Sequence, residues 1–111
     1  MSPRDLVYVG HMLDTARKAV SKTQGISRES YDADENLRLA LIHLIQTIGE
    51  AARQVSKDFC NRHPDIRWAD IIGMRHKVVH DYLGVDDDIV WQVATDDLPR
   101  LMTSLEGLGL Q

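Results

Sequence analysis

Four polar side chains that could do chemistry together, Arg75, His76, His80 and Tyr82, lie within eight residues of the 111-residue sequence. On a helix that turns about 100° per residue, Arg75 and Tyr82 would lie about 20° apart and His76 and His80 about 40° apart. His80 would lie about 140° around the helix from Arg75 and roughly 7.5 Å along its axis. The pair could therefore bracket a group such as a phosphodiester more easily than touch each other.

These residue types suit the cleavage of a phosphodiester without a metal ion. An imidazole with a pKa of about 6.5 can take the proton from a ribose 2′-hydroxyl or give one to the leaving 5′-oxygen. A guanidinium can donate two hydrogen bonds to the phosphate oxygens as negative charge builds up. One His80 supplies only one of the two proton transfers. A symmetric dimer that brings two copies of the motif together would supply both, unless His76 provides the second group.

Two other interpretations of the motif stay open. In the first, Arg75 is a surface ion-pair residue, the two histidines are partly buried polar residues, and Tyr82 contributes its ring to the core. In the second, His76 and His80 bind a metal ion from one helix face. Two histidines do not hold a specific zinc ion, and no Glu lies between them. We therefore expect neither a metal ion nor a cofactor.

Length and composition predict one domain, residues 1–111, with a hydrophobic core that needs no disulfide or metal. The single cysteine, Cys60, cannot form an intramolecular disulfide. The sequence has neither a signal-peptide pattern nor an uninterrupted apolar run of about 18 residues. These features predict a soluble, cytoplasmic protein with no membrane partner.

The charge distribution limits the kinds of partner. A net charge of −4 argues against a protein that binds nucleic acid through a broad basic surface. Residues 1–28 and 51–77 are net basic, whereas 29–50 and 78–111 are net acidic. This pattern suits either a two-sided molecule or ordinary solvated helix faces. The segment from Asp81 to Asp97 contains six aspartates and no Lys or Arg, which would suit a basic protein partner.

Apolar residues recur at helical spacing, and no alternation typical of strands appears. The pattern predicts helices over about residues 3–25, 31–59, 70–83 and 86–108, the last with a kink or restart at Pro99. Asp86 or Asp87 should cap the last of these, and Trp68 should be a packing anchor. The expected fold class is all-α, an up-and-down bundle of four to five helices.

The sequence resembles the HEPN superfamily, and specifically its HepT-like toxins. Arg75, His80 and Tyr82 match the family's R-x4-H-x-Y signature. The position after the arginine is often asparagine in the family and is His76 here. Further agreement comes from Ile48-Gly49-Glu50-Ala51-Ala52, Trp68, Ile72-Gly73-Met74 and Asp97-Leu98-Pro99, so that the resemblance covers nearly the whole chain.

The resemblance implies a homodimeric ribonuclease toxin of a toxin–antitoxin system, with its active site at the subunit interface. Arg75 would stabilise the phosphate of the RNA, His80 would transfer protons, and His76 would be a second proton-transfer group or a phosphate contact. The resemblance also implies a nucleotidyltransferase antitoxin that transfers AMP to Tyr82. No DNA partner is expected. The alternative is a non-catalytic helical module that binds a nucleotide or another protein.

Overall fold

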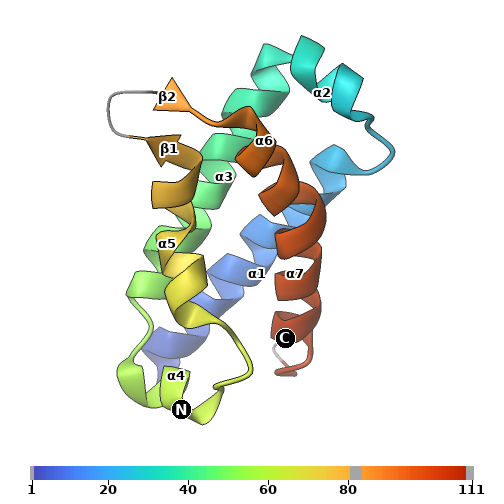
Figure 1. Ribbon diagram of the computed structural model, residues 1–111. Helices are drawn as coiled ribbons and strands as arrows, with labels where there is room; N and C mark the ends of the chain where they lie inside the picture. Colours follow the sequence, from blue (N-terminus) through green and yellow to red (C-terminus); the bar gives the residue numbers. More distant parts are fainter. Residues whose placement is uncertain (1, 81–83, 110–111) are drawn as a thin grey trace.

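The computed structural model describes residues 2–80 and 84–109, with the backbone alone for residues 75, 79, 80, 84 and 85 (Figure 1). The elements are α1 (Pro3–Thr23), α2 (Arg28–Ala33), α3 (Glu35–Arg53), α4 (Lys57–Arg62), α5 (Trp68–Val78), β1 (Val79–His80), β2 (Gly84–Val85), α6 (Asp87–Gln92), the π-helix η1 (Val93–Asp97) and α7 (Leu98–Glu106). The chain runs up α1, down α3, up α5 and down α6–η1–α7 (Figure 1). The predicted all-α, up-and-down bundle is confirmed.

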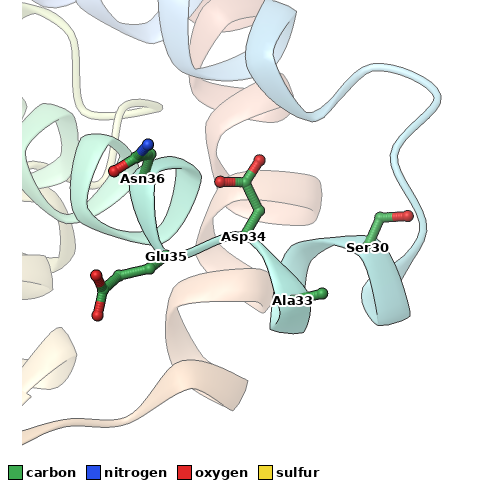
Figure 2. Close-up of a pocket in the computed structure, with 5 residues that line it drawn as sticks. All are labelled: Ser30, Ala33, Asp34, Glu35 and Asn36. Carbon is green, nitrogen blue, oxygen red and sulfur yellow. The ribbon is translucent and has the colours of Figure 1, made fainter.

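Local capping signals set where the helices begin. The Ser2 hydroxyl accepts a hydrogen bond from the Asp5 amide at 3.2 Å, and Pro3 occupies the first turn of α1. Asp34 lies at the junction of α2 and α3 (Figure 2), and its carboxylate accepts from the Leu37 amide at 3.0 Å. Asp86 caps α6 in the same way, accepting from the amides of Asp88 and Ile89. The predicted starts at residues 3 and 86 are therefore confirmed.

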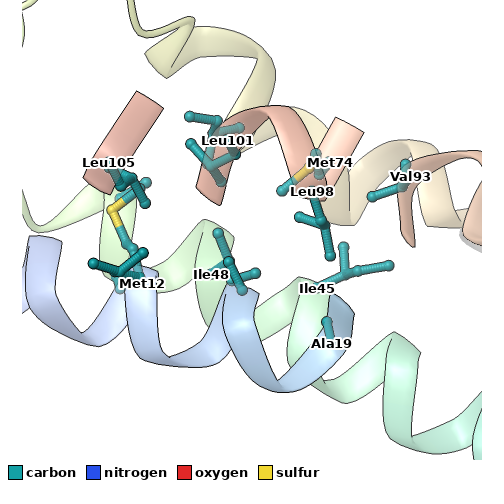
Figure 3. Close-up of a cluster of buried hydrophobic side chains, with 14 of the residues drawn as sticks. Met12, Ala19, Ile45, Ile48, Met74, Val93, Leu98, Leu101 and Leu105 are labelled. Atoms are coloured by element: carbon teal, nitrogen blue, oxygen red, sulfur yellow. The ribbon is translucent and has the colours of Figure 1, made fainter. Parts of the chain in front are cut away.

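The core lies between α1, α3, α5 and the α6–η1–α7 segment. Met12 and Ala19 of α1, Ile45 and Ile48 of α3, Met74 of α5, Val93 of η1, and Leu98, Leu101 and Leu105 of α7 are all buried in it (Figure 3). Trp68, at the start of α5, is also buried. Its indole N–H donates to the His63 carbonyl at 3.0 Å, and its ring lies edge-on to Phe59. The prediction that Trp68 is a packing anchor is confirmed.

The predicted long second helix is wrong at both ends. A separate short helix, α2, precedes it, and α3 ends at Arg53 rather than near Phe59. The break follows from a distant side chain: the buried Asp5 carboxylate of α1 accepts from the Ser56 amide at 2.8 Å and from its hydroxyl at 2.7 Å. The Ser56 hydroxyl in turn caps α4. Ala52 before the break, Val55 within it and Phe59 after it are all buried, so the apolar pattern continues across it.

The predicted motif helix over residues 70–83 is also wrong. It begins slightly earlier, at Trp68, and ends at Val78. Beyond it, β1 pairs antiparallel with β2, with Val79 opposite Val85 and His80 opposite Gly84. Two β-branched residues at the helix end favour the extended chain. The Asp86 amide also donates to the Val78 carbonyl at 3.2 Å, and this hydrogen bond joins the end of α5 to the residue that precedes α6.

The last helix restarts near Pro99, as predicted. A π-helical turn from Val93 to Asp97 leads into α7, and the Leu98 amide donates to the Val93 carbonyl. Pro99 lies in the first turn of α7, where its missing N–H costs least. The wider π-helical turn therefore accommodates Pro99, and the helix continues with little interruption from α6 to α7.

Candidate active site

The three motif residues that the structure describes, Arg75, His76 and His80, lie around the end of α5 rather than on one helix. The backbone places Arg75 and His76 on α5, and His80 on β1 beyond the helix end. Tyr82 lies outside the described residues. The predicted angle of about 40° between His76 and His80 assumed a shared helix, so this part of the prediction is wrong. The predicted angle of about 20° between Arg75 and Tyr82 involves a residue outside the described part of the chain.

Close contact with α3 holds α5 in place. A Cβ atom built at Gly49 would lie 3.4 Å from the Ile71 carbonyl oxygen and 3.6 Å from that of Ile72. These are ordinary van der Waals distances for a Cβ atom, so the space between the two helices at Gly49 has room for little more than a methyl group. Ile71 and Met74 are buried beside this contact. The segments around Gly49 and Ile72 therefore position the motif helix, although neither supplies a reacting group.

One face of α5 is open to solvent. Ala69, Ile72 and His76 are exposed on it, and Ile72 retains 37% of its accessible surface. Gly73 lies among them, and a Cβ atom there would meet nothing within 4 Å. Spacings of three and four residues place these residues on one stripe, which we call the α5 stripe. His76 is consequently a surface residue, contrary to the interpretation that places it partly in the core.

The chain between α5 and α6 is tied at both ends. Val78 is fully buried at the end of α5, and its carbonyl accepts from the Asp86 amide. Between these two residues, His80 of β1 pairs with Gly84 of β2. Gly84 lies two residues before Asp86, which caps α6. The backbone position of His80 therefore depends on where α6 begins.

Sequence reasoning missed the residues that hold the start of α6. Arg28 and Tyr31 of α2 and Arg38 of α3 contact Asp87 and Asp88, from 49 to 60 positions away in the chain. Separations of this length leave no periodic or local signal. Only the opposite net charges of residues 1–28 and 78–111 could have suggested a pairing, and that signal concerns Arg28 alone.

The acidic segment is less available to a basic partner than its composition suggested. Arg28 and Arg38 pair with Asp88 and Asp87. Arg100 donates to both carboxylate oxygens of Asp96 at 2.7 Å. At least three of the six aspartates are therefore already neutralised within the chain.

Two hollows lie away from the motif side chains that the structure describes. A groove of about 420 Å³ between α5 and α7 has both basic and acidic walls, including Asp70, Lys77, Asp97 and Arg100. A shallower hollow of about 530 Å³ at the α2–α3 junction is lined by Ser30, Ala33, Asp34, Glu35 and Asn36 (Figure 2). His76, the motif residue whose side chain the structure describes, lines neither hollow.

Within residues 2–80 and 84–109, no group of three or more His, Cys, Asp or Glu side chains is placed to hold a metal ion. In the same part of the chain, no helix is long and apolar enough to cross a membrane.

Comparisons with known proteins agree with the sequence signature. The family model described as "Ribonuclease HepT-like" matches residues 12–108. A protein from Thermococcus cleftensis named "Probable ribonuclease HepT" is 35% identical over 86 residues, covering 78% of each chain. Two proteins named "Putative RNase" are also similar. The one from Methanocaldococcus jannaschii is 28% identical over 107 residues (96% of this chain, 98% of the relative), and the one from Caldanaerobacter subterraneus is 33% identical over 94 residues (85% and 84%).

No solved structure gave a significant match. The family model nevertheless spans nearly the whole chain, from the middle of α1 to just past α7, and includes the entire motif. The chain therefore belongs to the HepT-like family of ribonucleases.

Proposed function

We propose that the protein is a metal-independent endoribonuclease toxin of a toxin–antitoxin system, in which Arg75 and His80 do the chemistry. The observation that carries this proposal is the family match across residues 12–108, together with the intact signature of Arg75, His80 and Tyr82. The fold adds that Arg75 and His80 flank the end of α5, where the chain is tied back to α6.

The reaction needs one base and one acid. One His80 removes the proton from a ribose 2′-hydroxyl, whose oxygen then attacks the adjacent phosphorus. The partner's His80 gives a proton to the departing 5′-oxygen, so that a 2′,3′-cyclic phosphate and a 5′-hydroxyl remain. Arg75 donates hydrogen bonds to the non-bridging oxygens, where charge develops. His76, exposed on the same helix, provides a further phosphate contact or a second proton-transfer group.

A homodimer would supply the second histidine. The α5 stripe supports this assembly because it presents the exposed Ile72 beside Ala69 and the unobstructed Gly73, about one helical turn before His76. Small residues four apart allow two helices to approach closely. A twofold axis at this stripe would bring the two copies of Arg75 into one region.

The deciding experiment is incubation of the purified protein with total RNA in excess EDTA. Cleavage should persist in EDTA, and Arg75→Ala and His80→Ala should each lower the rate by about 10²- to 10³-fold without loss of helical signal. The matched control is His11→Ala, which removes an exposed histidine of α1. If His80→Ala cleaves at the wild-type rate, the assignment is wrong. Partner binding without RNA cleavage under any tested condition would favour the non-catalytic module.

The antitoxin is a nucleotidyltransferase that silences the site by attaching AMP to Tyr82. An attached AMP would add bulk and a phosphate close to Arg75 in sequence, and so compete with RNA for the guanidinium. We expect the co-expressed protein to gain mass in AMP units on the Tyr82 peptide and to lose ribonuclease activity. Tyr82→Phe should remain unmodified. An unmodified Tyr82 in a fully inhibited complex would show that the antitoxin acts by occlusion alone.

A further inference from the structure

The short β1–β2 ladder needs support from outside itself. Each strand has two residues, and an isolated two-stranded ribbon is marginally stable even when it is longer. One side of the ladder is fixed, because Val78 is fully buried at the end of α5. The other side continues through Asp86 into the first turn of α6. Whatever holds that first turn therefore holds the backbone of His80.

Three side chains from α2 and α3 hold it. Arg28 Nη2 lies 2.6 Å from Asp88 Oδ1, and the Tyr31 hydroxyl donates to Asp87 Oδ1 at 3.4 Å. Arg38 Nε lies 3.9 Å from Asp87 Oδ2. We call these five residues the α6 clamp. We propose that Arg28, Tyr31 and Arg38 are positioning residues of the ribonuclease, which set His80 in place by clamping the start of α6; this inference rests on the proposed role of His80.

The clamp is itself built on a firm base. Tyr31 is fully buried, and its ring centroid lies 5.1 Å from that of Trp91, which is one turn further along α6. Arg38 also donates to the carbonyls of Tyr31 and Asp32, which fastens the end of α2 to α3. Burial, followed by the charge of Asp87, raises the pKa of Tyr31, so its hydroxyl stays protonated and remains a donor.

The path from the clamp to the motif is short. Asp87 and Asp88 form the first turn of α6, and Asp86 caps that turn. The Asp86 amide donates to the Val78 carbonyl. This hydrogen bond closes the segment in which His80 pairs with Gly84. Loosening the first turn of α6 would release the Asp86 amide and with it the ladder.

The clamp should act on one catalytic group and spare the other. Arg75 lies on α5, which is held by α3 at Gly49, whereas His80 lies beyond the helix end. Proton transfer depends steeply on position: a misplacement of about 1 Å can cost roughly 10²-fold. Binding of RNA phosphate by Arg75 does not need the ladder. Weakening the clamp should therefore lower kcat while leaving KM nearly unchanged.

The test uses the Arg28→Ala/Tyr31→Phe double variant. Asp88→Asn is a milder second variant that leaves the buried Tyr31 unchanged. The matched control is Arg17→Ala, which removes a comparable exposed ion pair, Arg17–Glu106 at 2.9 Å, between α1 and α7. Hydrogen exchange of the Asp86 amide reports the closure, and exchange of the Ile48 amide in the buried middle of α3 reports global unfolding. Initial rates of RNA cleavage give kcat and KM.

We expect the double variant to speed exchange at Asp86 about tenfold relative to Ile48 and to lower kcat by a similar factor, with KM within about twofold. Asp88→Asn should give a smaller effect in the same direction, and Arg17→Ala should give none. Equal acceleration at Asp86 and Ile48, unchanged exchange at Asp86, or a rise in KM with unchanged kcat would each overturn the proposal. If the wild type cleaves no RNA, the proposed function fails, and the role of Arg28, Tyr31 and Arg38 as positioning residues fails with it. Exchange at the Asp86 amide still shows in that case whether these three residues hold the start of α6.

Discussion

At the scale of single residues, Asp5 shows how one buried carboxylate determines a helix boundary. Its oxygens accept from the Ser56 amide and hydroxyl, and Ser56 in turn caps α4. The backbone hydrogen bond from Ser56, followed by that from its hydroxyl, lowers the pKa of Asp5 below its ordinary value of 3.8. Folding therefore favours the charged carboxylate of Asp5, and this makes the free energy of unfolding depend on pH.

Asp5 should therefore contribute to acid unfolding. Because its pKa is lower in the folded state, its contribution is complete above about pH 4 and is lost as the pH falls towards the folded-state value. We expect Asp5→Asn to lower the free energy of unfolding at neutral pH by about 1–3 kcal/mol. The variant should also lose less stability than the wild type below about pH 4.

Urea unfolding measured at several pH values tests this expectation. Asp14→Asn is the matched control, because Asp14 is an exposed acid on the same helix. Parallel stability curves for the wild type and Asp5→Asn across the acid range would show that Asp5 has no such role.

At the scale of elements, the contact between α3 and α5 is the one that places the motif helix. Gly49 lies at this contact, and a Cβ atom there would already touch the carbonyl oxygens of Ile71 and Ile72, which leaves no room for a larger side chain. Gly10, on α1, has open space instead, so that nothing would meet a side chain at that position. The two glycines therefore form a natural pair for comparison.

We expect Gly49→Val to destabilise the protein by about 1–3 kcal/mol more than Gly10→Val does, because overpacking forces the helices apart. Helix propensity changes equally in both variants and cancels in the comparison. Thermal unfolding gives the difference in stability, and RNA cleavage at a temperature where both variants are folded gives the effect on the site. Equal stability of the two variants would mean that the helices are not held by this close approach.

At the scale of the whole molecule, the proposed reaction takes its second histidine from another copy of the chain. The α5 stripe is the surface on which we expect it to pack, since Ile72 is exposed there and Gly73 is unobstructed. Contact across this stripe would also cover His76 in part, which links the assembly to the site.

Gly73→Glu should convert the dimer to a monomer, because two buried like charges would meet across the axis. Gly10→Glu is the control, as it adds the same side chain in open space on another helix. Light scattering after size-exclusion chromatography measures the mass. Cleavage of RNA should fall with dimerisation, and a Gly73→Glu monomer that still cleaves would exclude a site shared between subunits.

A composite site can also be tested by mixing inactive chains. Arg75→Ala and His80→Ala should each be nearly inactive alone. A mixed dimer keeps one Arg75 and one His80, and it should recover part of the activity if the two act together across the interface and His76 supplies the second proton transfer. The inactive control is Arg75→Ala mixed with itself at the same total concentration. Absence of recovery in a proven heterodimer would mean that the reaction needs both copies of His80 or that each site takes both residues from one chain.

The sequence by itself determined the fold class, the starts of the helices at Pro3 and near Asp87, and the restart near Pro99. These features are local: a cap or a proline acts on amides within one turn, and apolar periodicity reports which face is buried. The chemistry of the motif was also local information, since residue types and spacing indicated phosphodiester cleavage. The family match agrees with that ribonuclease interpretation.

Only the tertiary structure decided where α3 and α5 end and on what element His80 lies. The first end depends on Asp5, which is 51 positions from Ser56, and the second depends on the Asp86 amide and the ladder. The α6 clamp likewise joins Arg28 to Asp88 across 60 positions. Apolar periodicity continues through such breaks because residues on both sides are buried. Hydrogen bonds between distant segments end a helix without leaving a mark on its hydrophobic pattern.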